Sequence, residues 1–408
     1  MLKGNAVIGQ SGGPTAAINA TLSGVVLGCK EAGIERIYGA LNGIEGLLEE
    51  RMCDLRALLK DSKDHKVLEQ TPAAALGSCR KKMPVPDKDP ETYSKLLEIF
   101  KKYNIRYFFY IGGNDSMDTV LKLSTYMNGA GYEMRVMGVP KTIDCDLAET
   151  DHTPGYGSAA KYIATTVQEI MRDTAVYTVK AVTIVEIMGR DAGWLTAAAS
   201  LPSLYGYASP DLVYLPEVNF NYDNFYEDLE KAFEKHPNVV VAVSEGVRTE
   251  DGRYVGEGTQ SGVADVFGHK YLSGTGKALE LAVKEKFGCK VRSIELNLPQ
   301  RCAAHLQSKT DIEESVEIGK AAALHAAAGE TGKMACFVRE STSPYKCSIK
   351  TSDISKIANE VRSVPRSYIN ERGNNVTKEC LEYISPLIQG ELSNVFENGL
   401  PKHFVIER

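Results

Sequence analysis

Residues 107–116 read YFFYIGGNDS, an apolar run that ends in two glycines and three polar residues. Short aromatic or β-branched runs that stop at a turn signal are typical of strands buried in a parallel sheet. Further runs of this kind recur along the chain at residues 6–8, 36–38, 136–139, 181–187, 239–243, 291–296 and 335–338. This recurrence predicts a sheet-based fold with mostly parallel strands.

Helical patterns separate the predicted strands. Residues 225–233 place apolar side chains on one face at the spacing i, i+4, i+7 and i+8. Thr310 and Glu313 have the spacing of a capping box, which predicts a helix start there. The proline-rich residues 81–90 predict a loop. Strands that alternate with helices indicate α/β layers.

The composition is ordinary for a globular protein, with 43% hydrophobic and 25% charged residues in a chain of 408. At about 100–200 residues per domain, this length predicts two or three domains. The net charge of −6 argues against a broad electrostatic surface for nucleic acid. No apolar run approaches the ~18 residues of a membrane helix. We therefore expect neither nucleic acid nor a membrane as a partner.

The cysteines and the N-terminal residues indicate in which cellular compartment the protein is expected. The nine cysteines are scattered and form no C-x-x-C pair, a pattern typical of reduced thiols rather than of a disulfide framework or zinc site. The first residues, MLKGN, lead directly into the predicted strand at 6–8 and do not have the features of a signal peptide. We therefore expect a cytoplasmic protein.

Two glycine-rich turns follow predicted strands. Residues 9–15 (GQSGGPT) precede a helical stretch, and backbone N–H groups in such a turn can approach an anion. Residues 112–116 (GGNDS) add oxygen-bearing side chains where ligands of an open α/β sheet bind, and these oxygens could hold a hydrated Mg²⁺. Taken singly, each also fits an ordinary turn, with a helix N-cap at Asp115 or Ser116 in the second.

Further polar clusters follow later strands. Residues 140–146 (PKTIDCD) combine a lysine with two aspartates, which can accept a proton, hold a metal and neutralise a transferring phosphoryl group. The alternative is an acidic surface loop. Residues 186–190 (EIMGR) end a strand with an arginine suited to phosphate, although a solvent-exposed arginine fits equally well. Glu245, Arg292 and Arg301 are weaker candidates on their own.

In this order, the motifs between Ala6 and Arg301 resemble those of the phosphofructokinase family, including its Gly-Ser-x-Arg segment at residues 77–80. The resemblance implies catalytic roles for Asp144, Lys141 and Arg80, with Asp144 as the base that takes the proton of the sugar C1 hydroxyl. It implies donor binding by Gly12, Gly13, Asn114 and Asp115. It implies substrate binding by Thr142, Asp146, Met188, Gly189, Arg190, Glu245, Arg292 and Arg301. The implied Mg²⁺ ligands are Asn114, Asp144 and Asp146.

Within this family resemblance, two residues indicate which phosphoryl donor the protein uses. Asp115 and Lys141 match the diphosphate-dependent members of the family, whereas ATP-dependent members have glycine at both positions. An aspartate adds bulk and negative charge where the α-phosphate of ATP would pass, and a lysine adds a cation for a terminal phosphate. The implied reaction is reversible phosphoryl transfer from diphosphate to C1 of fructose 6-phosphate, a step of glycolysis that gives fructose 1,6-bisphosphate and phosphate.

The resemblance also implies an architecture and leaves alternatives. We expect two Rossmann-like α/β domains with largely parallel sheets facing a central cleft, in a homo-oligomer, either a dimer or a tetramer. The expected domains are 1–155 for the donor, 156–300 for the sugar phosphate and 301–408 completing both. Leu298 stands where the family has a sugar-phosphate histidine, so sedoheptulose 7-phosphate is a second possible acceptor. The alternative functions are an ATP-dependent 6-phosphofructokinase and a non-catalytic sugar-phosphate sensor.

Overall fold

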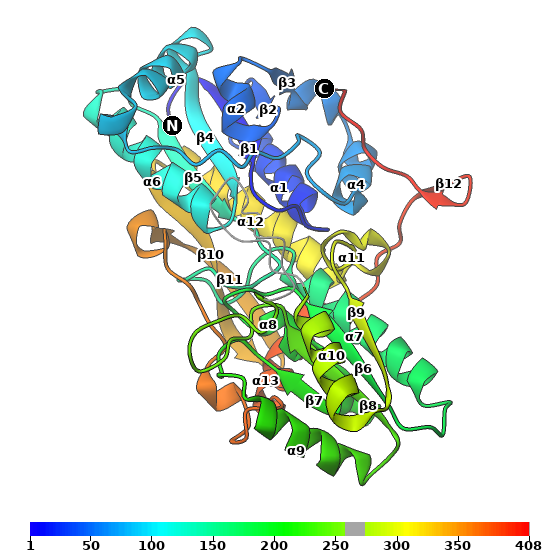
Figure 1. Cartoon of the computed structure of the whole chain (residues 1–408). Coiled ribbons are helices and arrows are strands. Elements are labelled where there is room, and N and C mark those ends of the chain that lie inside the picture. Colours follow the sequence, from blue (N-terminus) through cyan, green and yellow to red (C-terminus); the bar gives the residue numbers. More distant parts are fainter. Residues whose placement is uncertain (258–273, 408) are drawn as a thin grey trace.

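The computed structural model describes residues 1–257 and 274–407, and these contain two large sheets and a small two-stranded one, β12 (Phe396–Glu397) with β13 (Leu400–Pro401) (Figure 1). The first has seven strands in the order β11-β10-β5-β4-β1-β2-β3. Its strands are β1 (Asn5–Gln10), β2 (Ile37–Ala40), β3 (Met52–Asp54), β4 (Ile105–Gly112), β5 (Arg135–Pro140), β10 (Lys333–Thr342) and β11 (Tyr345–Asp353). The second has four strands in the order β7-β8-β6-β9. They are β6 (Ala181–Ile187), β7 (Leu212–Tyr214), β8 (Asn238–Ser244) and β9 (Lys290–Glu295).

The strands of both sheets are mostly parallel. In the first sheet β2, β1, β4, β5 and β10 run parallel, and only the edge strands β3 and β11 are antiparallel to their neighbours. All pairs of the second sheet are parallel. Each strand predicted from the sequence overlaps an observed one, so the expected α/β class with largely parallel sheets is confirmed.

The helices are distributed around both sheets. They are α1 (Ile18–Glu31), α2 (Gly43–Leu48), α3 (Leu55–Leu58), α4 (Ser62–Gln70), α5 (Pro90–Lys102), α6 (Asn114–Gly129), α7 (Tyr156–Thr174), α8 (Trp194–Ala198), α9 (Tyr222–Phe233), α10 (Thr275–Phe287), α11 (Pro299–Cys302), α12 (Lys309–Ala327) and α13 (Lys378–Ile384). Among the residues described, no helix is both long and apolar enough to span a bilayer.

Two hydrophobic layers cover the first sheet. On one face α1 and α12 pack on the sheet, and on the other α5 and α6 do so. The two helices of the first pair approach closely at Gly24, where an added Cβ would lie 2.0 Å from the carbonyl oxygen of Val316. Glycine permits this contact because it has no side chain. The contact seats α12, which is distant in the sequence, directly on the N-terminal helix.

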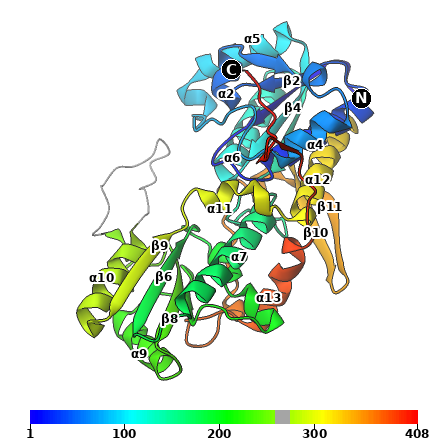
Figure 2. The same cartoon turned by 90° about the vertical axis from the view of Figure 1, so that its right-hand side faces the viewer.

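The second sheet is covered in the same way. Side chains of α7, α8 and α13 form a core on one face, and those of α9 and α10 form a core on the other. The predicted helix at 225–233 is confirmed as the main part of α9, with Phe225 and Leu229 buried. Figure 2 shows the two sheets in separate lobes, with α7 and α11 near their junction.

The predicted helix start at Thr310 is wrong, and the alternative interpretation of an N-cap at Asp115 or Ser116 is excluded as well. The side chain of Ser308, not Thr310, caps α12 by accepting from the N–H of Asp311, so the proposed capping box does not form. The Thr310 hydroxyl instead donates to the carbonyl of Gln389. In the first sheet, α6 begins at Asn114 after Gly113, so neither Asp115 nor Ser116 is its N-cap.

The chain returns to the first lobe twice. β10 pairs with β5 after the second sheet has been completed. The C-terminal residues then lie beside α4, where the Nε2 of Gln70 donates to the carbonyl of Val395 at 2.9 Å. The N–H of Phe404 donates to the Oγ1 of Thr71 at 2.8 Å, and both termini lie in this lobe in Figure 2. The domain boundaries at residues 155 and 300 stay a prediction.

Candidate active site

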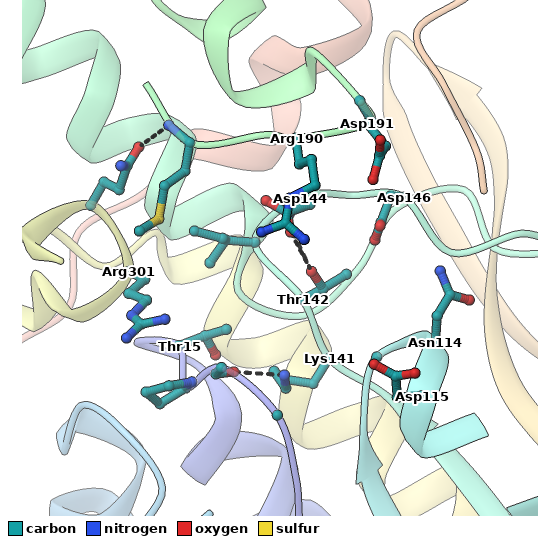
Figure 3. A pocket seen from close by; sticks show the side chains of 18 of the residues that line it. Thr15, Asn114, Asp115, Lys141, Thr142, Asp144, Asp146, Arg190, Asp191 and Arg301 are labelled. Carbon is teal, nitrogen blue, oxygen red and sulfur yellow. Dashed lines mark hydrogen bonds between the residues drawn. The ribbon is translucent and has the colours of Figure 1, made fainter. Parts of the chain in front are cut away.

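A cavity of about 890 Å³ lies where the two sheets meet (Figure 3). Its wall contains the loops that follow β1, β4 and β5 of the first sheet and β6, β8 and β9 of the second. All six are carboxyl ends of strands, the end at which open α/β sheets bind ligands. The polar motifs predicted from separate parts of the sequence therefore share one space.

The loop after β1 supports the loop that carries Arg80. The N–H of Gly12 donates to the carbonyl of Cys79 at 3.1 Å, and the Oγ of Ser11 donates to the same carbonyl at 3.2 Å. Gly12 has φ of +78°, a left-handed backbone that glycine adopts without strain. Since the N–H of Gly12 already has a partner, this residue contributes by bringing Arg80 to the wall of the cavity.

A group of cations borders the same glycines. Lys141 is 3% exposed, and its Nζ donates to the carbonyl of Gly13 at 2.6 Å. An added Cβ at Gly13 would lie 3.2 Å from the Nη1 of Arg301. The pKa of Lys141 is lowered to about 8, mainly by burial; the charges of Asp144 and Asp146 oppose this shift, and those of Arg301 and Arg80 add to it. Three cationic side chains thus gather at this wall of the cavity, an arrangement suited to binding phosphate.

The aspartate turn after β5 faces these cations. The N–H of Asp144 donates to the Oγ1 of Thr142 at 3.1 Å, which fixes the start of the turn. Burial raises the pKa of Asp144, and burial together with the charge of Asp144 raises the pKa of Asp146 to about 7. Asp191, which the sequence analysis missed, adds negative charge beside Asp144. A raised pKa makes a carboxylate a better proton acceptor in general base catalysis.

The residues at one side of the cavity fit Mg²⁺. Figure 3 shows Asn114, Asp146 and Asp191 along the same side of the cavity. The Oδ1 of Asn114 is buried and has no hydrogen-bond partner among the described residues. Magnesium prefers carboxylate and amide oxygens, and a cation would compensate both this oxygen and the neighbouring carboxylates.

The second sheet supplies the opposite wall. The Oε1 of Glu245 accepts from the N–H of Gly189 at 3.3 Å, and burial raises the pKa of Glu245 to about 8. Gly189 has φ of +127°, which a residue with a side chain rarely adopts. The N–H of Met188 donates to the Oε1 of Gln300 at 3.2 Å. This wall combines carboxyl, amide and apolar groups suited to a hydroxylated ligand.

Of the residues predicted for the site, all but Gly189 and Arg292 line the cavity. Gly189 acts behind the wall through its hydrogen bond to Glu245. Arg292 lies within β9, paired with Thr183 of β6, and borders a separate hollow beside Tyr177. It is three residues before the end of β9, so a strand rise of about 3.3 Å per residue separates it from that end by about 10 Å.

Several lining residues were missed by the sequence analysis. They include Lys82, Asp191, Gln300, Asn359 and Val361. The Nζ of Lys82 lies 3.5 Å from the Oδ1 of Asp115, so a cation stands beside the residue predicted to select the donor. Lys82 and Asp191 are close in the sequence to predicted residues, which is a usable signal. Asn359 and Val361 belong to a segment without any motif.

Comparison with known proteins gives a consistent result. Residues 5–312 match the family described as Phosphofructokinase. The chain is 40% identical to the pyrophosphate–fructose 6-phosphate 1-phosphotransferase of Halomonas elongata, over 98% of this chain and 96% of that one. It is 33% identical to the sulfofructose kinase of Alkalicoccus urumqiensis, over 90% and 92% of the two chains.

A solved structure agrees in fold and length. The crystal structure of the pyrophosphate-dependent phosphofructokinase of Nitrosospira multiformis has a TM-score of 0.88 and 36% identity, and it covers 99% of this chain and 96% of that one. The resemblance inferred from the motifs is thereby confirmed. The chain belongs to the phosphofructokinase family.

Proposed function

We propose that this enzyme transfers a phosphoryl group reversibly from diphosphate to the C1 oxygen of fructose 6-phosphate. The observation that carries the proposal is the position of Lys141 and Asp115 in the same cavity as the aspartate turn. The names of the relatives that match nearly the whole chain support the diphosphate donor over the ATP alternative.

Different residues of the cavity have different roles in the proposed reaction. Asp144 accepts the proton of the C1 hydroxyl while the C1 oxygen forms a bond to the terminal phosphorus of diphosphate. The bond from that phosphorus to the bridging oxygen breaks, and its electron pair leaves with the phosphate product. Lys141 and Arg80 stabilise the charge on the phosphoryl oxygens. A positioned general base such as Asp144 contributes about 10²–10⁴-fold to the rate.

Magnesium is the proposed cofactor, and Asn114, Asp144 and Asp146 would hold it. When bound, it would neutralise charge on the diphosphate oxygens. The buried Oδ1 of Asn114 and the raised pKa of both aspartates support this assignment, because a divalent cation relieves each of them.

Donor selection follows from charge and space. Asp115 sits in the first turn of α6, and its carboxylate pairs with Lys82 at 3.5 Å. A nucleotide must carry a third phosphate and a nucleoside past this carboxylate, whereas diphosphate ends before it. Repulsion between Asp115 and the extra phosphate, together with the loss of space, disfavours ATP.

The acceptor is bound at the other wall, by Thr142, Met188, Arg190 and Glu245, with Arg301 for its phosphate. Leu298 lines the cavity where a polar ligand for that phosphate is expected, so the acceptor needs its own test. We further propose a homo-oligomer in the cytoplasm. The free thiols of all nine cysteines support a reducing compartment.

Turnover assays with purified protein and Mg²⁺ test the proposal. We expect at least 100-fold higher kcat/KM with diphosphate than with ATP when fructose 6-phosphate is the acceptor. Sedoheptulose 7-phosphate and sulfofructose serve as comparison acceptors. A wide preference for ATP would establish the ATP-dependent alternative, and sugar-phosphate binding without turnover on either donor would establish the sensor.

A further inference from the structure

The aspartate turn contains a residue with an unfavourable backbone. Cys145, between the two aspartates, is fully buried and has φ of +56°. This left-handed region costs a residue with a side chain roughly 1–2 kcal/mol, and such a conformation persists only where the surroundings hold it. The turn also places Asp144 and Asp146 in the wall of the same cavity. Whatever holds Cys145 therefore also sets the direction of both carboxylates.

Arg362 makes the contacts that hold this turn. Its Nη1 donates to the carbonyl of Cys145 at 3.3 Å and lies 3.5 Å from the Sγ of the same residue. Its backbone N–H donates to the carbonyl of Asp146 at 2.8 Å, and the adjacent Val361 forms a bridge with Leu147. One residue thus engages two successive carbonyls of the turn from a segment more than 200 residues away in the sequence.

Arg362 is itself fixed by two aromatic residues. Its Nη2 donates to the hydroxyl of Tyr383 at 2.9 Å, and that hydroxyl donates to the carbonyl of Asp151 at 2.6 Å. Its guanidinium lies 4.3 Å from the centre of the Trp194 ring, and the Nε1 of Trp194 donates to the carbonyl of Arg362 at 3.1 Å. The planar guanidinium can meet both Cys145 and Tyr383 at once, which a lysine ammonium cannot.

We propose that Arg362 is a positioning residue for the transfer reaction, which orients Asp144 and Asp146 by holding the backbone of Cys145. This role rests on the proposed function. Arg362 is not among the residues that line the cavity, so it acts through the turn and touches neither substrate. Its loss changes the direction of the carboxylates rather than the affinity for fructose 6-phosphate.

The test compares two arginines that share one neighbour. Arg339 is buried, donates to the carbonyl of Tyr383 at 2.7 Å and pairs with Asp151, but no contact joins it to the aspartate turn among the residues described. The variants are Arg362→Lys, Arg362→Met and the control Arg339→Lys. Kinetics with both substrates, calorimetric binding of fructose 6-phosphate and the pH profile of kcat are measured for each.

We expect Arg362→Lys to lower kcat about 10–100-fold, while the KM for fructose 6-phosphate stays within about threefold of wild type and this sugar phosphate binds with full stoichiometry. The pH profile should shift, because the surroundings of both carboxylates change. Arg339→Lys should lose thermal stability but keep kcat within about twofold. Tyr383→Phe, which keeps the ring and removes the hydroxyl, should give an intermediate kcat and serves if Arg362→Met does not fold.

Two results would overturn the positioning role. One is a kcat near wild type in Arg362→Lys with an unchanged pH profile. The other is an equal loss of kcat in Arg339→Lys, which would assign the effect to general stability. Absence of wild-type turnover would overturn the proposed function instead. Crystal structures of Arg362→Lys and wild type then decide the matter, because an unchanged Cys145 backbone contradicts the role and a flipped one supports it.

Discussion

Replacing Lys141 by methionine should make the ligand-free enzyme more stable and nearly inactive. The lysine is 3% exposed, and its burial lowers its pKa from 10.5 to about 8. At about 1.36 kcal/mol per pKa unit, this shift corresponds to about 3 kcal/mol against the folded state at neutral pH. Loss of the hydrogen bond to Gly13 offsets about 1 kcal/mol. The expected net gain in the free energy of unfolding is about 2 kcal/mol.

The sign of the pH dependence follows from proton binding. Between pH 8 and pH 10.5 the unfolded wild-type chain binds more protons at Lys141 than the folded one does. The stability contributed by this group therefore rises with pH in that window and is unfavourable below it. The advantage of Lys141→Met should be largest below pH 8 and should shrink toward pH 10.5.

Urea unfolding of the ligand-free proteins at pH 7 and pH 10 measures the difference in the free energy of unfolding between Lys141→Met and wild type. Lys81→Met changes an exposed lysine and serves as the control, since its free energy of unfolding should stay near that of wild type. In the same preparations, kcat/KM for diphosphate should fall about 10²–10³-fold, as for loss of one charged donor to a developing oxyanion. A variant less stable than wild type at pH 7, or a difference in the free energy of unfolding that stays constant with pH, would refute the reasoning.

Asp144→Asn should lower kcat about 10²–10⁴-fold while calorimetric binding of fructose 6-phosphate stays within about threefold; a kcat near wild type excludes Asp144 as the base. Asp115→Gly should raise the ratio of ATP to diphosphate turnover in a donor competition assay, and an unchanged ratio contradicts selection by that carboxylate. Gly24→Ala should destabilise the protein by about 3 kcal/mol in urea unfolding, since the new Cβ would lie 2.0 Å from the carbonyl oxygen of Val316; wild-type stability would contradict that close approach.

Local patterns were sufficient for most of the sheet. Continuous apolar runs such as residues 107–111 are recognisable because both faces of a parallel strand are buried. The edge strand β11 was missed because its burial is mixed and its residues are largely polar. The wrong start of α12 has a similar cause, since a T-x-x-E spacing does not reveal that Ser308 two residues earlier takes the capping position.

The site was predictable where it follows strand ends and unpredictable where tertiary structure alone builds it. Motifs after β1, β4, β5, β6 and β8 converge because parallel strands end at one edge. Arg292 fails this rule, since it lies inside β9 instead of after it. Arg362 reaches the aspartate turn, and Asn359 reaches the cavity, only because the chain folds back, and no local pattern encodes that return.

The late insertion of β10 beside β5 constrains the order in which a ribosome can release a finished lobe. All four strands of the second sheet are synthesised before residue 333, where β10 begins. The partner edge of β5, which ends at residue 140, therefore stays unpaired until β10 has been synthesised. During that interval one edge of β5 offers unpaired amides to any passing strand. We therefore expect misassembly to be concentrated in nascent chains that end between residues 140 and 333. Slow translation of this interval should prolong the time during which the edge of β5 is exposed.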